Sequence, residues 1–431
     1  MNNFQLIILT HLSFTSVFFV FEVTLAGLLY AMLDYDRDEK TYAAYDRMTA
    51  HELFLRMGLS KRLVDDFITP TLLVGLFKPP EELSAALVMD LLYFYAFAHQ
   101  TSFDVRWMRK GTIASSIIKP LVEKLEQDYD LEVMPYSRVD SIGMRSDQPN
   151  LVGSIEYSAY DKQSDSVKKG KIADIDAIVL AVGATGMKSI VNGSPALGKK
   201  SIELSNAASL NAISCISARI WLDKIVPTPC PANVFSRFED LRGAGGTFFM
   251  LDQLQSGNDL WNEDREDKGS VVACDFYNSG ALMSLSDEEI LSILKERLLP
   301  SAVPAFKDAN VIDYEVRKYG GAVSWFSPGS YRTRPPLAIK GIDNIVCAGD
   351  WVKLGDREHG AKGLCQERAF VSGLEAANQL VRNNALKGSK GRLAEVLPVR
   401  DDEPQVQLGR DINKRIMSVL DPLGLGSFWV R

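Results

Sequence analysis

The sequence predicts a mixed α/β fold in which buried strands are followed by helices. Two short apolar runs end abruptly at glycine, residues 177–182 before Gly183 and residues 345–348 before Gly349, as buried strands do. Asp350 places a carboxylate at the carboxyl end of the second strand. A strand, a carboxylate and then a helix with a slim face form a layout for holding a nucleotide cofactor in an open sheet. The slim face consists of small residues at helical spacing, namely Ala369, Ser372, Gly373, Ala376 and Ala377.

Composition sets broad limits on the class of protein. A chain of 431 residues with 46% apolar side chains can bury a large core, and its length predicts two or three domains. The net charge of −7 offers no basic surface for nucleic acid, so no nucleic-acid partner is expected. The five cysteines are scattered without a CxxC or Cys/His cluster. We therefore expect reduced thiols in an intracellular compartment, with neither a metal site nor a disulfide framework.

The first part of the chain is unusually apolar. Between Phe4 and Leu33 the only side chain charged at neutral pH is that of Glu22. Such a run is long enough to cross a bilayer, but a carboxylate in mid-membrane is costly. The run also lacks the basic start of a signal peptide and the arginines of a transit peptide. A core or membrane-surface helix, an aberrant start and a membrane anchor all stay open at this point.

Residues 41–100 are predicted to be helical. Thr49 followed by Glu52 forms a capping box, and Ser60 and Ser84 are further N-cap residues. Pro70 is predicted to end the helix that Ser60 begins.

Residues 109–188 are predicted to combine a helix with short strands. The helix begins near Arg109 and has one buried face, formed by Ile113, Ile117, Leu121 and Leu125. Short β segments follow at 131–135, 139–144 and 153–157, and a charged tip at 162–171 precedes the strand that ends at Gly183.

The next stretch is predicted to form a second sheet. Residues 214–223 and 271–277 alternate like strands, with a glycine-bounded apolar segment at 245–251 between them. Ser286 and the acidic residues after it begin a helix that reaches Leu299, before Pro300. Residues 384–431 are expected to be a tail without a catalytic role.

Several landmarks in this order resemble one family. They are Asn344-Ile-Val-Cys-Ala-Gly-Asp-Trp351, the helix Gln366 to Ala377, the phrase Leu73 to Ala86 with Lys-Pro-Pro-Glu-Glu-Leu, and Arg109-Lys-Gly-Thr112. Over residues 24–383 the chain resembles the superfamily of flavin amine oxidases and carotenoid desaturases, and most closely its desaturase-like branch (phytoene and zeta-carotene desaturases). The resemblance implies a Rossmann-like FAD-binding domain with an inserted substrate domain of helices and an antiparallel sheet.

The resemblance also implies where FAD binds. Val139 would lie at the adenine end, and Asp350 would face the ribityl chain. The helix start would lie near the isoalloxazine ring. The remaining residues implied to bind the cofactor are Gly183, Gly349, Trp351, Gln366 and Glu367. The chain departs from the family at Arg368, where a glycine is usual. No catalytic acid–base pair is implied.

One landmark of the family is missing from the sequence. No strand–G-x-G-x-x-G–helix unit occurs, although its glycines and helix start normally hold the pyrophosphate. The family's first strand, glycine loop and acidic ribose clamp would precede residue 24. We therefore expect an incomplete cofactor domain, with open strand edges around the strand that ends at Gly349. Either the chain is an incomplete product, or it is a degenerate member that has lost cofactor chemistry.

The function expected from the resemblance is that of an FAD-dependent oxidoreductase. It would oxidise a long apolar, carotenoid-like substrate by hydride transfer to flavin and pass the electrons to a quinone or oxygen. Substrate entry from a membrane surface, in a plastid or another intracellular membrane system, would suit the apolar helices. The alternatives are a noncatalytic membrane-associated protein that binds an apolar ligand, a flavin amine oxidase, and a structural protein anchored by residues 4–33.

The landmarks divide the chain into six predicted segments. They are an apolar segment 1–35, a helical part of the substrate domain 36–108, an FAD-domain segment 109–188, the substrate-domain sheet and helix 189–310, a C-terminal FAD-binding segment 311–383 and a polar tail 384–431.

Overall fold

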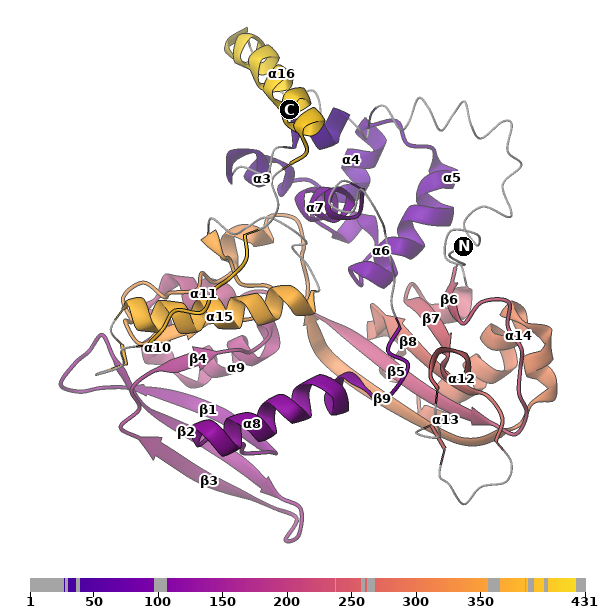
Figure 1. Cartoon of the computed structure of the whole chain (residues 1–431), viewed down its shortest axis with the longest axis horizontal. Coiled ribbons are helices and arrows are strands. Elements are labelled where there is room, and N and C mark those ends of the chain that lie inside the picture. Colours follow the sequence, from indigo (N-terminus) through magenta and orange to yellow (C-terminus); the bar gives the residue numbers. More distant parts are fainter. Residues whose placement is uncertain are drawn as a thin grey trace.

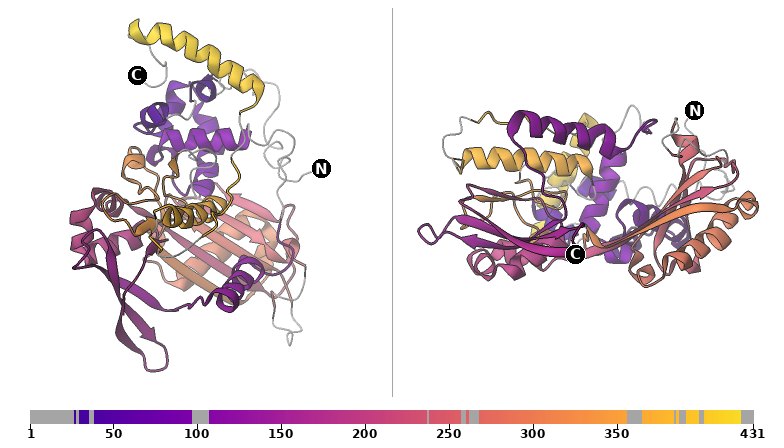
Figure 2. Two further views of the ribbon diagram at one scale, coloured as in Figure 1. Left: turned by 60° about the vertical axis from the view of Figure 1, so that its left-hand side comes forward. Right: turned by 90° about the horizontal axis from the view of Figure 1, so that it is seen from below.

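The computed structural model contains three separate sheets and a group of N-terminal helices (Figure 1). A three-stranded meander and a five-stranded sheet lie at opposite ends of the molecule (Figure 2). The structure describes residues 27, 30–35, 39–96, 107–236, 238–256, 260–261, 268–355, 365–383, 385–386, 391–398 and 402–423.

The meander comprises β1 (Ser137–Met144), β2 (Val152–Asp161) and β3 (Ser166–Ala173), all antiparallel. The strands expected at 139–144 and 153–157 are present. Residues 131–135 form no strand, and β3 occupies most of the stretch predicted to be a charged tip. The tip is shorter because residues 166–173 pair in continuous register with β2, and Lys168 pairs with Asp161 across the hairpin at 2.9 Å.

The two strands predicted from the glycine-terminated runs form a parallel pair. β4 (Ile178–Leu180) is followed by α9 (Ala184–Gly193), and β10 (Ile345–Cys347) precedes α15 (Gln366–Arg382). Open edges are expected on β10 and on its neighbour; the edge of β10 is partly covered, because Cys347 N donates to Leu337 O at 2.8 Å and Ala338 bridges Val346. Within the described part of the chain, it is β4 that has no strand on its outer edge.

The predicted second sheet has five antiparallel strands. Their order is β6 (Ala232–Phe235), β7 (Gly245–Met250), β8 (Val271–Tyr277), β5 (Ala212–Leu222) and β9 (Val311–Ser324). One face packs in a core with α13 (Asp287–Ser292), α14 (Leu299–Ala302) and the π-helical turn between them, through residues such as Ile220, Phe276 and Leu294. The opposite face carries the polar residues described below.

The N-terminal helices form the third part of the fold. They are α3 (Glu39–Tyr45), α4 (Ala50–Arg56), α5 (Lys61–Leu63), α6 (Thr69–Gly75) and α7 (Ala85–Ala96). The N-caps predicted at Thr49, Ser60 and Ser286 are confirmed by hydrogen bonds to the third helical N–H group. Three shorter α-helices are α10 (Pro195–Lys200), α11 (Ile202–Ala208) and α12 (Leu251–Leu254).

Two prolines do not end helices where the sequence predicts that they do. Pro70 and Pro300 each follow a π-helical turn, and the helix continues past both. The wider turn bonds residues five apart, so the ring and the missing N–H of proline are accommodated. Pro120 follows a third such turn, at the start of α8 (Lys119–Tyr129).

The helix leading into α8 differs from its prediction in burial. Its apolar residues do not form a buried face, since Ile113 is 42%, Ile117 56% and Leu121 45% exposed. An apolar face at helical spacing is usually covered by another helix or a sheet, but no described element covers this one.

The expected tail contains an ordered helix, α16 (Pro404–Leu420). It lies against the N-terminal helices at one end of the molecule (Figures 1 and 2). Buried Arg410 donates to Tyr35 O at 3.1 Å, and buried Asn413 donates to the Asp34 carboxylate at 3.1 Å. These contacts tie the two ends of the described chain together.

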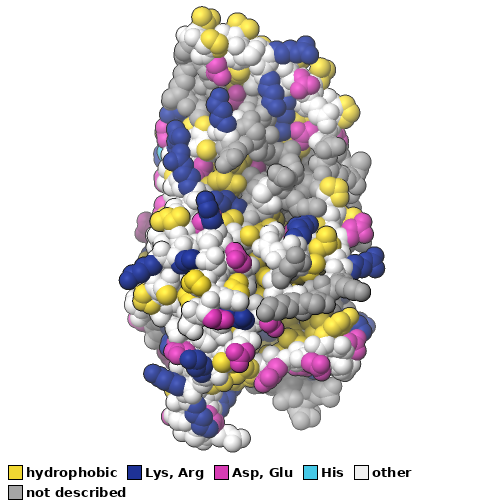
Figure 3. All heavy atoms as spheres, turned by 90° about the vertical axis from the view of Figure 1, so that its left-hand side faces the viewer, with side chains coloured by type: hydrophobic (Ala, Val, Ile, Leu, Met, Phe, Trp, Pro, Cys, Tyr) yellow, Lys and Arg dark blue, Asp and Glu magenta, His cyan; other side chains and the backbone are white. Residues whose placement is uncertain are grey.

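Most of the apolar segment at 4–33 lies outside the described residues. Among those described, no helix is both long and apolar enough to cross a membrane. On the face shown in Figure 3, lysine and arginine side chains are interspersed with aspartate and glutamate.

Candidate functional site

The turn after β10 is built around Gly349. This residue has a φ of 133°, and a Cβ there would lie 3.0 Å from the Trp351 ring, so glycine is required. Gly349 N donates to Ser372 Oγ at 2.7 Å, and Ser372 is fully buried on α15. The small residues on this helix therefore bring it close to the turn.

Trp351 joins the turn to the neighbouring strand. Its buried indole Nε1 donates to Val182 O at 3.1 Å, directly before Gly183. Gly183 in turn is the N-cap residue of α9. The structure thus brings Gly183, Gly349, Asp350 and Trp351 together at the carboxyl ends of two adjacent parallel strands.

Arg368 occupies the inside of this turn. It is 7% exposed, its Nε donates to Asp350 O at 2.8 Å, and its Nη2 donates to Val352 O at 2.6 Å. The guanidinium thereby satisfies two carbonyl groups and holds the turn against α15. This is the position at which the resembling family usually has glycine.

The Asp350 carboxyl group is half-buried in this environment. Burial raises the pKa of Asp350 to about 6, against the opposing effect of the Arg368 and Arg334 guanidinium groups. A carboxyl group with such a pKa gains from hydrogen-bond donors that a ligand supplies.

Arg334 is a residue near Asp350 that the motifs did not single out. It is 3% exposed and stacks on Phe326, with its guanidinium carbon 4.2 Å from the ring centre. Its Nη2 has no hydrogen-bond partner among the residues that the structure describes, and the same holds for Ser330 Oγ. Two orphaned polar atoms in a buried place are suited to a polar ligand group or ordered water.

The same loop also contacts the N-terminal helices. Asp46, which follows α3, accepts hydrogen bonds from Ser84 Oγ at 2.6 Å and from Tyr331 N at 3.2 Å. Asp46 is 2% exposed. The helical unit is therefore fixed against the loop that carries Arg334.

The other predicted cofactor residues lie elsewhere. Val139 is on β1, partly buried against the core. Gln366 and Glu367 are exposed in the first turn of α15, and no described hydrogen bond joins their side chains to Asp350. Their roles stay predictions.

A second polar cluster lies on the face of the five-stranded sheet that is turned away from its core. Thr247 of β7 and Ser217 of β5 stand in register on either side of Asp275 of β8. The Tyr277 hydroxyl lies 3.0 Å from Thr247 Oγ1. We call these residues, Ser217, Thr247, Asp275 and Tyr277, the Asp275 cluster.

Burial perturbs the titrating groups of this cluster. It raises the pKa of Asp275, and the hydroxyl of Ser217 and the charge of Arg219 act in the opposite direction. Burial and the nearby Asp275 raise the pKa of Tyr277 to about 12. Alternation in the sequence predicts β5 and β8, and the polar half of that alternation is the signal that could have located this cluster.

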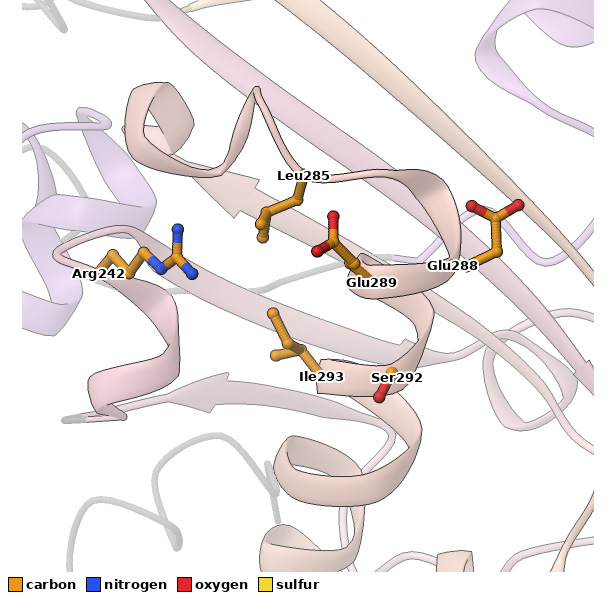
Figure 4. Close-up of a pocket in the computed structure, with 6 residues that line it drawn as sticks. All are labelled: Arg242, Leu285, Glu288, Glu289, Ser292 and Ile293. Carbon is orange, nitrogen blue, oxygen red and sulfur yellow. The ribbon is translucent and has the colours of Figure 1, made fainter.

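A surface cavity of about 350 Å³ lies at α13, among Arg242, Leu285, Glu288, Glu289, Ser292 and Ile293 (Figure 4). Its acidic side chains already have structural partners. Glu289 accepts from Ser286 N at 2.7 Å, and Glu288 accepts from the Tyr314 hydroxyl at 3.3 Å. Among the described residues, no three His, Cys, Asp or Glu side chains are placed to hold a metal ion.

The arrangement of a parallel pair, an antiparallel sheet and a helical unit defines the fold class. The same fold occurs in cyclohexylamine oxidase from Brevibacterium oxydans IH-35A, with a TM-score of 0.51 and 14% identity over 86% of this chain and 76% of that chain. At this identity the similarity establishes the fold alone. No protein-family model and no curated protein sequence matches the chain.

Weaker similarities link the chain to two further solved structures. One is an oxidoreductase from Methanosarcina mazei, with a TM-score of 0.44 and 11% identity over 77% of this chain and 68% of that chain. The other is a candidate protoporphyrinogen oxidase from Exiguobacterium sp. 255-15, with a TM-score of 0.47 and 14% identity over 78% and 67%.

Proposed function

We propose that this protein is an FAD-dependent oxidoreductase. The observation that carries the proposal is the Gly349–Asp350–Trp351 turn, which sets a half-buried carboxyl group at the carboxyl ends of two adjacent parallel strands. Ligands of open α/β sheets bind at this edge. The fold shared with cyclohexylamine oxidase, a named oxidase, supports the same class of activity.

The residues present fit one half of the cofactor. Asp350 suits the hydroxyl groups of a ribityl chain, and the orphaned Nη2 of Arg334 suits an acceptor atom close by. The described residues include no glycine loop to hold a pyrophosphate group. When bound, FAD supplies an acceptor for a hydride from a substrate C–H bond. The chain would contribute orientation and a buried, partly charged environment.

The substrate and partners are inferred from the resemblance alone. We propose a substrate with a long apolar body, carotenoid-like by resemblance, and a quinone or oxygen as the final electron acceptor. Association with a membrane surface, in a plastid or elsewhere in the cell, is part of the same proposal.

Titration of the purified chain with FAD tests the proposal. We expect saturable quenching of flavin fluorescence, with affinity reduced about tenfold or more in Asp350→Asn, because charge-assisted hydrogen bonds are lost. Asp343→Asn removes an exposed carboxylate from the loop before β10 and serves as the matched control. Absence of saturable binding to the wild-type chain would refute the cofactor assignment.

Arg368 favours a second candidate, a ligand-binding protein without flavin. Its guanidinium fills the turn at the position usually held by glycine and already satisfies two carbonyl groups. If Arg368→Gly binds FAD and the wild-type chain does not, the arginine blocks the cofactor and this second candidate is preferred.

A further inference from the structure

We propose that α16 is an interaction surface for a second copy of this chain, and that two α16 helices pair antiparallel about a two-fold axis. The helix (Pro404–Leu420) lies beyond residues 24–383, over which the chain resembles the flavin amine oxidase and carotenoid desaturase superfamily. Pairing of the helices does not depend on FAD, so it is tested separately from the function proposed above.

An apolar stripe on α16 is exposed to solvent. Leu408, Ile412, Ile416 and Val419 follow one another at intervals of four, four and three residues, so their side chains lie on one face of the helix. Ile416, the least exposed of the four, is 48% exposed. We call these four residues the α16 stripe. Within the described part of the chain, no element covers it.

A different face of α16 holds the helix on the N-terminal helices. Val406, Arg410 and Asn413 are the buried residues of α16. Gly409 lies close to the same contact, because a Cβ there would be 2.8 Å from the side chain of Leu33. The attached face thus contains an arginine, an asparagine and a glycine, while the large aliphatic side chains of the stripe stay outside. A helix that served only to pack on this protein would place its aliphatic side chains inward.

The position of α16 leaves room for a partner. The helix is the outermost element at its end of the molecule in Figure 1 and in the left view of Figure 2, away from all three sheets. Its 17 residues span about 25 Å at the usual rise of an α-helix. Two copies can therefore bring these helices together while their sheets stay apart.

Two charged residues beside the stripe favour a second copy as the partner. Asp411 and Arg415 are both exposed, lie four residues apart on one side of the helix, and form no ion pair within the described part of the chain. Ile412 and Ile416 are also four residues apart, with nearly the same midpoint. If two copies pair antiparallel about this midpoint, Ile412 packs against Ile416 of the second copy, and Asp411 lies near its Arg415. The surface is therefore complementary to itself in shape and in charge.

The same charges are less suited to a lipid surface. The exposed charged side chains of α16 are Asp411, Lys414 and Arg415, so the helix is almost neutral outside its attached face. Helices that lie on membranes usually carry several lysines and arginines on their polar face. A single pair of helices buries less than a standard interface, so we expect a reversible dimer that dissociates in the micromolar range.

Sedimentation equilibrium of the full chain, from micromolar to near-millimolar concentration, tests the dimer. Ile412→Ser should raise the dissociation constant about tenfold or more, because each dimer loses two packed side chains. Ile202→Ser removes an isoleucine that is 72% exposed on α11 and serves as the matched control, with no change expected. A wild-type chain that stays monomeric throughout, or an equal effect of both substitutions, would overturn the proposal.

Charge reversal tests the antiparallel arrangement. Asp411→Arg and Arg415→Asp each place like charges opposite one another in a dimer, and each should weaken it about tenfold. An equimolar mixture of the two variants should form a heterodimer, because the arginines of one chain then meet the aspartates of the other. The double variant should dimerise like the wild-type chain. If each single variant dimerises as tightly as the wild-type chain, the two-fold arrangement is refuted.

Two further measurements separate this dimer from a lipid contact and from the flavin function. Ile412→Ser and the wild-type chain should sediment equally with vesicles of phosphatidylcholine and phosphatidylserine. If vesicle binding depends on Ile412 and no dimer forms, a lipid surface covers the stripe and the proposal fails. We expect Ile412→Ser to bind FAD with wild-type affinity. If neither chain binds FAD while the dimer depends on Ile412, the pairing stands and the flavin function fails, and FAD binding by a monomeric wild-type chain gives the reverse.

Discussion

Asp350 and Asp275, two partly buried carboxylates, are supported in different ways. Two guanidinium groups act on Asp350, and the backbone around it is held by Arg368 and Ser372. Asp275 has one hydroxyl partner and a distant arginine. The first carboxylate belongs to a rigid turn that the protein itself stabilises. Among the residues that the structure describes, the second has no ionic partner.

The largest expected effect concerns the rigid turn. Arg368→Ala removes the donors to the carbonyl groups of Asp350 and Val352, and each buried group left unpaired costs about 1–3 kcal/mol. We expect a loss of roughly 2–6 kcal/mol in the free energy of unfolding, by summing both groups. Urea denaturation measures it. Arg382→Ala, at the exposed end of the same helix, is the control, and an equal loss in both variants would contradict the role of Arg368.

A smaller loss is expected at the contact between the two parallel strands. Trp351→Phe keeps most of the buried ring but removes the N–H group that binds Val182 O. The unpaired carbonyl should cost about 1–2 kcal/mol. Urea denaturation measures the loss. If Trp351→Phe loses more free energy of unfolding than Arg368→Ala, the indole ring and not its hydrogen bond holds the strands together.

These two contacts illustrate what the sequence alone predicts about the site. Contiguous patterns located β4, β10, the turn at Gly349 and the slim face of α15, because each feature depends on neighbours within a few residues. Arg334 and the Asp275 cluster were missed. Their members are far apart in the chain, and strand register, which no local pattern encodes, brings residues 217, 247 and 275 into one row.

The rest of the fold shows the same difference between features that depend on sequence neighbours and features that depend on distant residues. The helix caps at Thr49 and Ser286 were predicted correctly, since a cap depends on one side chain and the next turn. Burial was harder to predict. The periodic face at Ile113 and Ile117 is exposed, and Arg410 in the presumed tail is buried, because burial depends on which elements meet.

A pH titration measures the effect of the Asp350 carboxyl group on stability. The folded pKa of Asp350 is about 6, above the ordinary value of 3.8, so the folded state binds this proton more tightly than the unfolded state. The contribution to stability is complete below pH 3.8 and is lost as the pH rises through about 6. In Asp350→Asn the free energy of unfolding should change less over this range. An unchanged profile would show that other groups dominate.

A bound ligand should make Asp350 favour its ionised form over its protonated form. Hydroxyl donors on a bound ligand favour the ionised carboxylate and lower its pKa. FAD affinity should therefore rise as the pH increases through about 6, and this rise should be absent in Asp350→Asn. Fluorescence titrations at a series of pH values measure it, and a pH-independent affinity would separate FAD from the carboxylate.

The smallest effect is expected from Asp275→Asn. Whether the free energy of unfolding rises or falls in this variant shows whether Asp275 is a structural residue. If Asp275 were a structural residue, its loss would weaken the sheet, as removal of a buried hydrogen-bonded carboxylate usually does. If it is not, the folded protein carries the cost of burying its charge, and asparagine removes that cost at neutral pH while Ser217 keeps a partner. Because Asp275 has no ionic partner among the described residues, we expect a small gain in the free energy of unfolding. A clear loss in stability would place Asp275 with Arg368 among the structural groups.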